Sequence, residues 1–90
     1  MIQKFRPKRF LFCEHLVKSK SIDMLHAEAV WWAAKYGPIS AAQLARLTSS
    51  NKGRIREATK ALTLTGLLRT NRKGKVCATH QAIRIYERIA

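Results

Sequence analysis

Helix start and stop signals follow one another closely between residues 37 and 66, and they limit the folds open to this chain. Gly37 and Pro38 end one helix, because glycine suits a left-handed cap and proline cannot continue the helical hydrogen bonds. Ser40 then starts a second helix, and Gln43 stands three residues on, where it completes a capping box. This region therefore predicts short helices joined by tight turns.

A polar stretch over residues 48–51 separates this second helix from a third. The second helix is expected to be about eight residues long, with an apolar face made of Ala41, Leu44, Ala45 and Leu47. Asn51 or Ser50 is a suitable N-cap for the third, which runs to about Thr65 and stops at Gly66. Its inward residues are expected to be Ile55, Ala58, Thr59 and Leu62. Together the two form a helix-turn-helix arrangement.

An earlier helix is predicted over residues 22–36, with Ser21 as its N-cap and Asp23 in its first turn. Apolar residues recur on it at three- and four-residue steps and predict one buried stripe: Ile22, Leu25, Ala29, Trp32 and Tyr36. Trp31 lies about 100° around the helix from Trp32. We therefore expect Trp31 to pack against the N-terminal segment or against a second subunit.

The residues after Gly66 predict a β-hairpin followed by a last helix. Two short strands are expected over residues 67–71 and 76–79, around a basic turn that contains Gly74. Thr79 is then a suitable cap for a closing helix, whose apolar side is formed by Ala82, Ile83, Ile85, Tyr86 and Ile89. The predicted fold class is mainly α with a small β-hairpin.

Residues 1–20 allow two readings. Pro7 suits the first position of a helix that would extend through Val17, whereas residues 10–17 also fit an extended strand. Residues 1–20 are therefore interpreted as a basic N-terminal arm or an extra element, and residues 21–90 as the main domain.

The charge of the chain is concentrated in two segments. Eighteen Lys or Arg stand against five Asp or Glu, which gives a net charge of +13. Residues 1–20 carry +5, residues 21–50 carry no net charge, residues 51–75 carry +7 and residues 76–90 carry +1. With 47% hydrophobic residues the chain can bury a core, so it is not a disordered polycation. This distribution predicts a scaffold that presents two basic surfaces to a polyanion.

The order of these elements resembles the winged helix-turn-helix DNA-binding domains of bacterial, phage and plasmid transcription regulators. Residues 44–50 look like the second helix and turn, residues 55–69 look like the recognition helix and first wing strand, and residues 79–89 look like the closing helix of MarR-like members. The resemblance covers residues 21–90. It implies a three-helix core with a wing and a C-terminal helix. It also implies a sequence-specific regulator that binds double-stranded DNA as a homodimer.

Three groups of basic or polar residues are the candidate DNA contacts. In the helix-turn-helix motif the second helix enters the major groove, and this helix contributes Asn51, Lys52, Arg54, Arg56 and Lys60. Lys52 and Arg56 are expected to read base edges, and Arg54 and Lys60 to contact phosphates. The wing contributes Arg72, Lys73 and Lys75, and an N-terminal arm would contribute Lys4, Arg6, Lys8 and Arg9.

Other functions find less support in the residues. Zinc ligands of the usual types occur in two pairs, Cys13 with His15 and Cys77 with His80. The single residue between Cys13 and His15 is a tighter spacing than is usual for zinc ligands, so buried thiols are the preferred interpretation. The acidic residues show no paired spacing, so we expect no enzyme activity, no cofactor and no metal. No apolar stretch is long enough to span a membrane, and we expect a cytoplasmic protein. A basic RNA-binding protein of ribosomal type and a protein-protein interaction module, with a protein partner, remain as alternatives.

Overall fold

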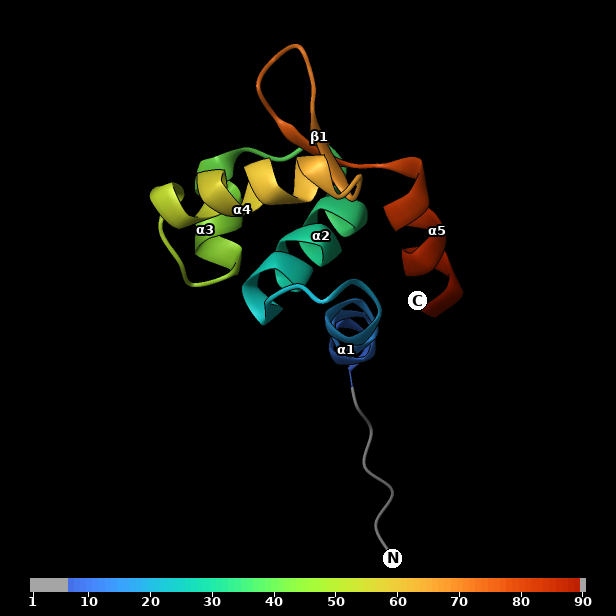
Figure 1. Cartoon of the computed structure of the whole chain (residues 1–90). Coiled ribbons are helices and arrows are strands. Elements are labelled where there is room, and N and C mark those ends of the chain that lie inside the picture. The colour runs from blue at the N-terminus through green and yellow to red at the C-terminus, as the bar shows by residue number, and fades with distance from the viewer. Residues whose placement is uncertain (1–6, 90) are drawn as a thin grey trace, which may run out of the picture.

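The computed structural model describes residues 7–89, which form five helices and one antiparallel hairpin (Figure 1). The elements are α1 (Lys8–Lys20), α2 (Met24–Tyr36), α3 (Ala41–Leu47), α4 (Lys52–Leu64), β1 (Leu68–Thr70), β2 (Val76–Ala78) and α5 (His80–Ile89). Figure 1 shows α2 in the middle, α1 below it, α3 and α4 on one side, α5 on the other and the hairpin projecting at the top. The predicted fold class, mainly α with a small hairpin, is confirmed.

Helix α2 is the centre of the core, because it contacts α1, α3, α4, α5 and β2. Its buried residues are Ala27, Ala29, Val30, Trp31 and Ala33. Of the predicted stripe only Ala29 belongs to this set, and Tyr36 is 56% exposed. The stripe prediction was wrong in part: Ile22, Leu25 and Trp32 pack against the core but are only partly buried, and α2 is covered from several sides and not on one face. Small alanine side chains allow these neighbours to approach it closely.

The start of α2 also differs from the prediction. Ser21 is the C-cap of α1, with a left-handed φ of 54°, and Asp23 is the N-cap of α2. The helix therefore begins at Met24 and not at Ile22. The prediction missed this shift because it did not expect another helix to end at Ser21.

Three aromatic rings join α1, α2 and α5. The ring of Trp31 lies 5.5 Å from that of Phe12 and 4.8 Å from that of Tyr86, and the Phe12 and Tyr86 rings are 6.0 Å apart. Trp31 is thus buried against the N-terminal segment, one of its two expected neighbours. Trp32, which was expected in the core, is only half-buried and stacks on Tyr36 at 5.7 Å.

The N-terminal part of the described chain is helical. Pro7 is the N-cap of α1, which extends three residues beyond the predicted end and buries Phe12, Cys13 and Leu16. Lys8 and Arg9, expected on an extended arm, instead open this helix, and the Arg9 guanidinium lies 5.5 Å from the centre of the Trp32 ring. Lys4 and Arg6 lie outside the described residues.

The hairpin is joined to the helical core by a bridge at its base. Its strands pair Leu68 with Ala78 and Thr70 with Val76. Ile39, between α2 and α3, forms a further bridge in which its N–H donates to the Val76 carbonyl at 2.9 Å and its carbonyl accepts from the Val76 N–H at 2.7 Å. Ile39 and Val76 are both buried, so the base of the hairpin belongs to the core.

Candidate nucleic-acid interface

Helix α3 begins with the predicted capping box. The Ser40 hydroxyl oxygen accepts from the backbone N–H of Gln43 at 3.1 Å, and the Gln43 side-chain oxygen accepts from the backbone N–H of Ser40 at 3.1 Å. Two backbone donors at the helix start are satisfied in this way. The helix has seven residues, and Leu44 and Ala45 are its buried members.

The turn between α3 and α4 is set by Ser49 and Asn51. Ser49 has a left-handed φ of 55°, and the next N–H, that of Ser50, donates to the carbonyl of Ala45 at 2.7 Å. Asn51 is the N-cap of α4, because its side-chain oxygen accepts from the backbone N–H of Arg54 at 2.9 Å. The direction in which α4 leaves α3 therefore depends on two adjacent cap structures.

Helix α4 separates an apolar side from a basic side. Ile55, Ala58 and Leu62 are fully buried, whereas the four basic residues that the sequence identified are all exposed: Lys52, Arg54, Arg56 and Lys60. Thr59, expected to face inward, is half-buried, and its hydroxyl donates to the carbonyl of Ile55 at 2.8 Å. At 100° per residue, Gly53, Arg56 and Lys60 lie opposite the buried side. This face holds the basic groups away from the core.

The end of α4 fixes where the hairpin starts. The N–H of Leu67 donates to the carbonyl of Leu62 at 2.9 Å, and the N–H of Gly66 donates to that of Thr63 at 3.2 Å. Gly66 has a φ of 81°, as this Schellman turn requires. Leu62 and Leu67 are both fully buried, so an apolar contact accompanies the turn. The predicted stop at Gly66 is confirmed.

Asn71 organises the tip of the hairpin, a role that the sequence did not reveal. Its side-chain oxygen accepts from the backbone N–H groups of Lys73 and Lys75, each at 2.9 Å. Its own carbonyl accepts from the N–H of Gly74, whose φ is 78°. Asparagine in a turn is a signal for such bonds, but the sequence does not tell which N–H groups it meets. Arg72, Lys73 and Lys75 are exposed around this framework.

The hairpin tip borders a surface hollow. Its volume is about 450 Å³, and it is lined by Pro38, Asn71, Arg72, Lys73 and Lys75. Pro38 comes from the connection between α2 and α3, next to the Ile39 bridge. The basic groups of the hairpin therefore lie beside the start of the helix-turn-helix segment.

Comparisons with known proteins bear on the fold. No protein-family model and no curated protein matches the sequence. The transcriptional regulator Tm0710 from Thermotoga maritima has a similar structure, with a TM-score of 0.75 at 14% identity. The MarR family protein Rv2887 from Mycobacterium tuberculosis has a TM-score of 0.70 at 13% identity. Each match covers 90% of this chain, which spans 61% of the other chain's length.

The chain has the winged helix-turn-helix fold. Helices α3 and α4 are the helix-turn-helix pair, β1 and β2 with their connection are the wing, and α5 is the closing helix. The resemblance that residues 44–50, 55–69 and 79–89 carried is thus confirmed at the level of the fold.

The cysteines of the winged helix are buried separately. Cys13 and Cys77 are both free, and residues 7–89 contain no group of three or more His, Cys, Asp or Glu side chains placed to hold a metal ion. Burial, with a contribution from Glu28, raises the pKa of Cys13 to about 12. Within the same residues no helix has the length and apolar character needed to cross a membrane.

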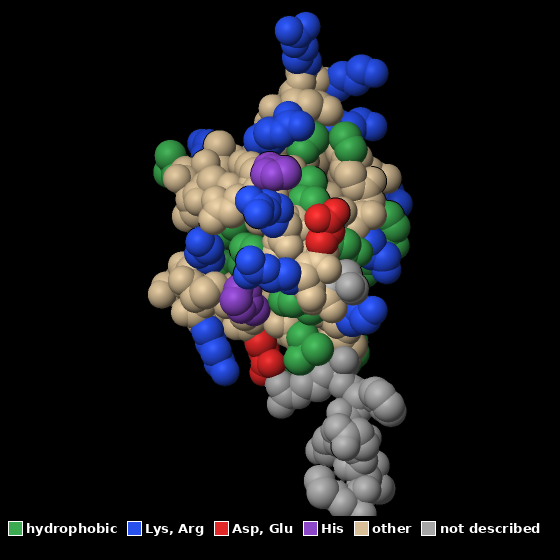
Figure 2. Space-filling view, turned by 90° about the vertical axis from the view of Figure 1, so that its right-hand side faces the viewer, with side chains coloured by type: hydrophobic (Ala, Val, Ile, Leu, Met, Phe, Trp, Pro, Cys, Tyr) green, Lys and Arg blue, Asp and Glu red, His purple; other side chains and the backbone are tan. Residues whose placement is uncertain are grey.

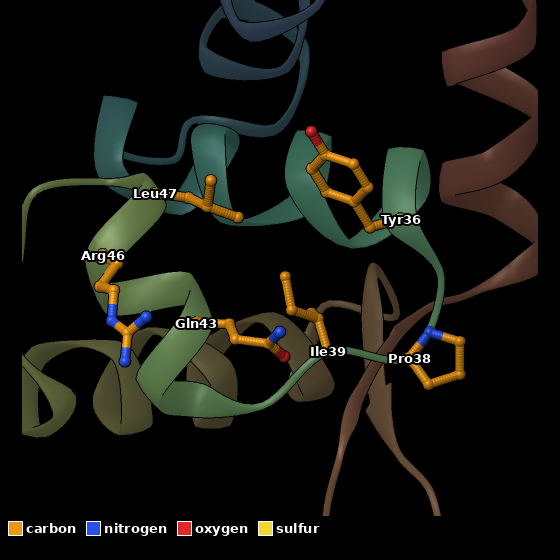
Figure 3. A pocket seen from close by; sticks show the side chains of 6 residues that line it. All are labelled: Tyr36, Pro38, Ile39, Gln43, Arg46 and Leu47. Carbon is orange, nitrogen blue, oxygen red and sulfur yellow. The ribbon is translucent and has the colours of Figure 1, made fainter.

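A second hollow lies on the winged helix between the end of α2 and α3 (Figure 3). It has a volume of about 400 Å³, and its lining combines Tyr36, Pro38, Ile39, Gln43, Arg46 and Leu47. The Gln43 side-chain oxygen is held by the capping box. Arg46 is the charged residue of this lining. The concentrated positive charge of the domain therefore lies elsewhere, on α4 and the wing.

Proposed function

We propose that this protein is a sequence-specific regulator of transcription that binds double-stranded DNA, and that it is not an enzyme. One observation carries the proposal: the exposed basic side of α4 and the basic wing are joined by a fixed turn at Gly66. A helix held in this way fits the major groove of B-form DNA, and a wing beside it reaches the neighbouring backbone or minor groove.

The residues of α4 divide into two roles in this proposal. Lys52 and Arg56 donate to base edges, because Arg and Lys match the two acceptors of guanine in the major groove. Arg54 and Lys60 contact phosphates, which position the protein without reading sequence. Asn51 holds the first turn through its bond to Arg54. The positive end of the helix dipole at this turn adds to the attraction for phosphate.

In the wing, Arg72, Lys73 and Lys75 contact the DNA backbone or the minor groove. Their contribution is electrostatic and depends little on sequence, because exposed cations on a turn neutralise phosphates wherever the duplex passes. The framework around Asn71 keeps these three side chains close together.

We also propose that the protein acts as a homodimer in the cytoplasm. Two copies would place two α4 helices on half-sites one turn of DNA apart. Phe10 and Leu11 on α1 are 49% and 41% exposed, which is unusual for adjacent large apolar side chains and fits burial against a second copy. Light scattering after size-exclusion chromatography measures the mass in solution. A monomer at all concentrations, with and without DNA, would contradict this part.

The central experiment selects a preferred duplex from a random library and measures affinity by fluorescence anisotropy at several salt concentrations. A specific regulator should prefer its site to unrelated duplexes by on the order of 10³-fold. Arg56→Ala should reduce this preference, whereas Lys73→Ala should weaken binding to all duplexes alike and lower the salt slope by about 0.9. Equal affinity for all duplexes, or preference for structured RNA, would overturn the proposal.

A second experiment tests the wing through Asn71. Asn71→Ala removes the acceptor of two backbone N–H groups without changing charge, and should weaken binding to specific and unrelated duplexes equally. Thr70→Ala serves as a matched control, because it removes an exposed and uncharged side chain from β1, outside the tip. If Asn71→Ala left the affinity unchanged, the order of the wing tip would not matter for DNA binding.

A further inference from the structure

Helix α5 carries basic residues that the proposed DNA contacts do not include. His80, Arg84 and Arg88 follow one another at four-residue steps, and all three are exposed. Side chains at this spacing lie above one another on one side of a helix. At 1.5 Å per residue, the row extends for about 12 Å along the axis. We call these three residues the α5 ridge.

The α5 ridge faces away from the core. The opposite side of the helix contains Ala82, which is fully buried, and Ile85, Tyr86 and Ile89, which pack against the core. Glu87 is exposed near the ridge and reduces its positive charge. A shallow hollow of about 420 Å³ runs along this side and is lined by His80, Gln81, Arg84, Ile85 and Arg88. Neither of the arginines is needed for packing.

The α5 ridge continues the basic surface of the wing. Figure 2 faces the side of the molecule on which α5 lies, and Lys and Arg side chains extend there from the projecting wing at the top down over the body. Helix α5 follows β2 with only Thr79 between them. The ridge therefore begins at the base of the wing and leads away from its tip.

Hydrogen bonds around Thr79 fix this direction. The Thr79 hydroxyl donates to the carbonyl of Gly66 at 2.6 Å, and the Thr79 N–H donates to that of Leu67 at 3.1 Å. The hydroxyl oxygen also accepts from the N–H of Ala82 at 3.3 Å and so caps α5. The end of α4, the base of the wing and the start of α5 are thus tied together, and the ridge has a defined position relative to the wing.

We propose that the α5 ridge binds the sugar-phosphate backbone of the DNA that flanks the site held by α4 and the wing. This inference rests on the proposed function. Guanidinium groups pair with phosphate through two parallel N–H bonds, and a row of them on an exposed helix suits a repeating anion rather than a single ligand. At 3.4 Å per base pair along the axis, the row matches roughly three to four base pairs of one strand. The duplex must bend toward α5 to reach Arg88, which long or flexible flanks allow.

Duplex length is the variable that tests this inference. Affinity is measured for the unaltered protein and for Arg84→Gln/Arg88→Gln, on the selected site alone and on the same site extended by ten base pairs on its wing side. The unaltered protein should bind the extended duplex about tenfold more tightly, with a salt slope steeper by about 1.8 for two phosphate contacts. The double variant should lose this gain and keep its affinity for the short duplex.

Two controls separate the ridge from charge in general. Lys18→Gln/Lys20→Gln removes the same charge from an exposed part of α1 and should leave the gain on extension intact. Glu87→Gln removes an acidic group beside the ridge and should increase the gain. Thermal unfolding followed by circular dichroism checks that each variant is folded.

The outcomes distinguish this inference from the proposed function. Specific binding to the short site, with no gain on extension, would overturn the α5 ridge contact and leave the regulator intact. An equal loss in the ridge and α1 variants would also overturn it, because the effect would then be general attraction. Failure to bind any duplex specifically would overturn the proposed function itself.

Discussion

Helices α2 and α4 have the same length of 13 residues but opposite relations to the rest of the molecule. Helix α2 buries five residues and contacts five other elements. Lys35 is the one Lys or Arg that it carries. Helix α4 buries three residues on one side and carries Lys52, Arg54, Arg56 and Lys60 on the others. The first helix is therefore enclosed by the rest of the fold, whereas the second leaves a basic side exposed to solvent.

The two helices also begin differently. Asp23 at the start of α2 makes no side-chain cap bond, whereas Asn51 at the start of α4 accepts from the N–H of Arg54. Helix α2 packs against several other elements, and Ala27, one turn after Asp23, is fully buried. The first turn of α4 is exposed, so its order depends on a local cap.

The largest expected difference concerns apolar side chains. Trp31→Ala removes the ring between Phe12 and Tyr86 and should lower the free energy of unfolding by about 3–5 kcal/mol. Leu64→Ala on α4 is the matched control, because this side chain is 89% exposed, and it should change that free energy by less than about 0.5 kcal/mol. Urea titration followed by circular dichroism measures both. Similar losses would show that α4 also depends on apolar contacts beyond its buried side.

The next effect concerns the two caps. Asn51→Ala removes the acceptor for the Arg54 N–H and should lower the free energy of unfolding by about 1 kcal/mol. Asp23→Ala, which removes no cap bond, should cost only a few tenths of a kcal/mol. Thermal unfolding of both variants gives the comparison. A larger loss for Asp23→Ala would mean that the start of α2 depends on that side chain after all.

The same contrast explains what the sequence could predict. The start of α3 and both ends of α4 follow from residues within one turn of each boundary: Ser40, Gln43, Asn51 and Gly66. The side of α2 that is buried depends on its packing against α1 and α5, which the spacing of apolar residues within α2 does not reveal. The choice between Trp31 and Trp32 was therefore not available from periodicity.

The candidate interface divides in a similar way. The exposed positions of Arg56 and Lys60 follow from the helical period once Ile55 and Leu62 are taken as buried. The bonds of Asn71 within the wing, and the tie from Thr79 to Gly66, depend on how the chain returns on itself. For residues 8–20, Pro7 is compatible with both a helix and a strand, and only the contacts of Phe12 decide between them.

A smaller effect is expected where the chain enters α4. Ser49 has a φ of 55°, which costs a residue with a Cβ about 1–2 kcal/mol relative to glycine. Ser49→Gly should therefore raise the free energy of unfolding by up to about 1 kcal/mol, because greater freedom of glycine in the unfolded chain offsets part of the gain. Ser19→Gly, at a helical position in α1, should lower it. Thermal unfolding checks both, and a loss for Ser49→Gly would show that its side chain stabilises the turn.

The smallest expected effect on stability comes from a substitution in α4 that should change stability and DNA binding in opposite directions. Gly53 is exposed on the basic side, and an added Cβ would meet one neighbour there, the Asn51 side-chain oxygen at 3.3 Å. Gly53→Ala should raise the free energy of unfolding by less than about 1 kcal/mol, because alanine favours the helix while the cap oxygen must shift slightly. The added methyl group should weaken DNA binding, since it holds the backbone of α4 away from the groove. Unfolding and anisotropy measurements on the same variant test both signs, and tighter binding would contradict the placement of Gly53 against the DNA.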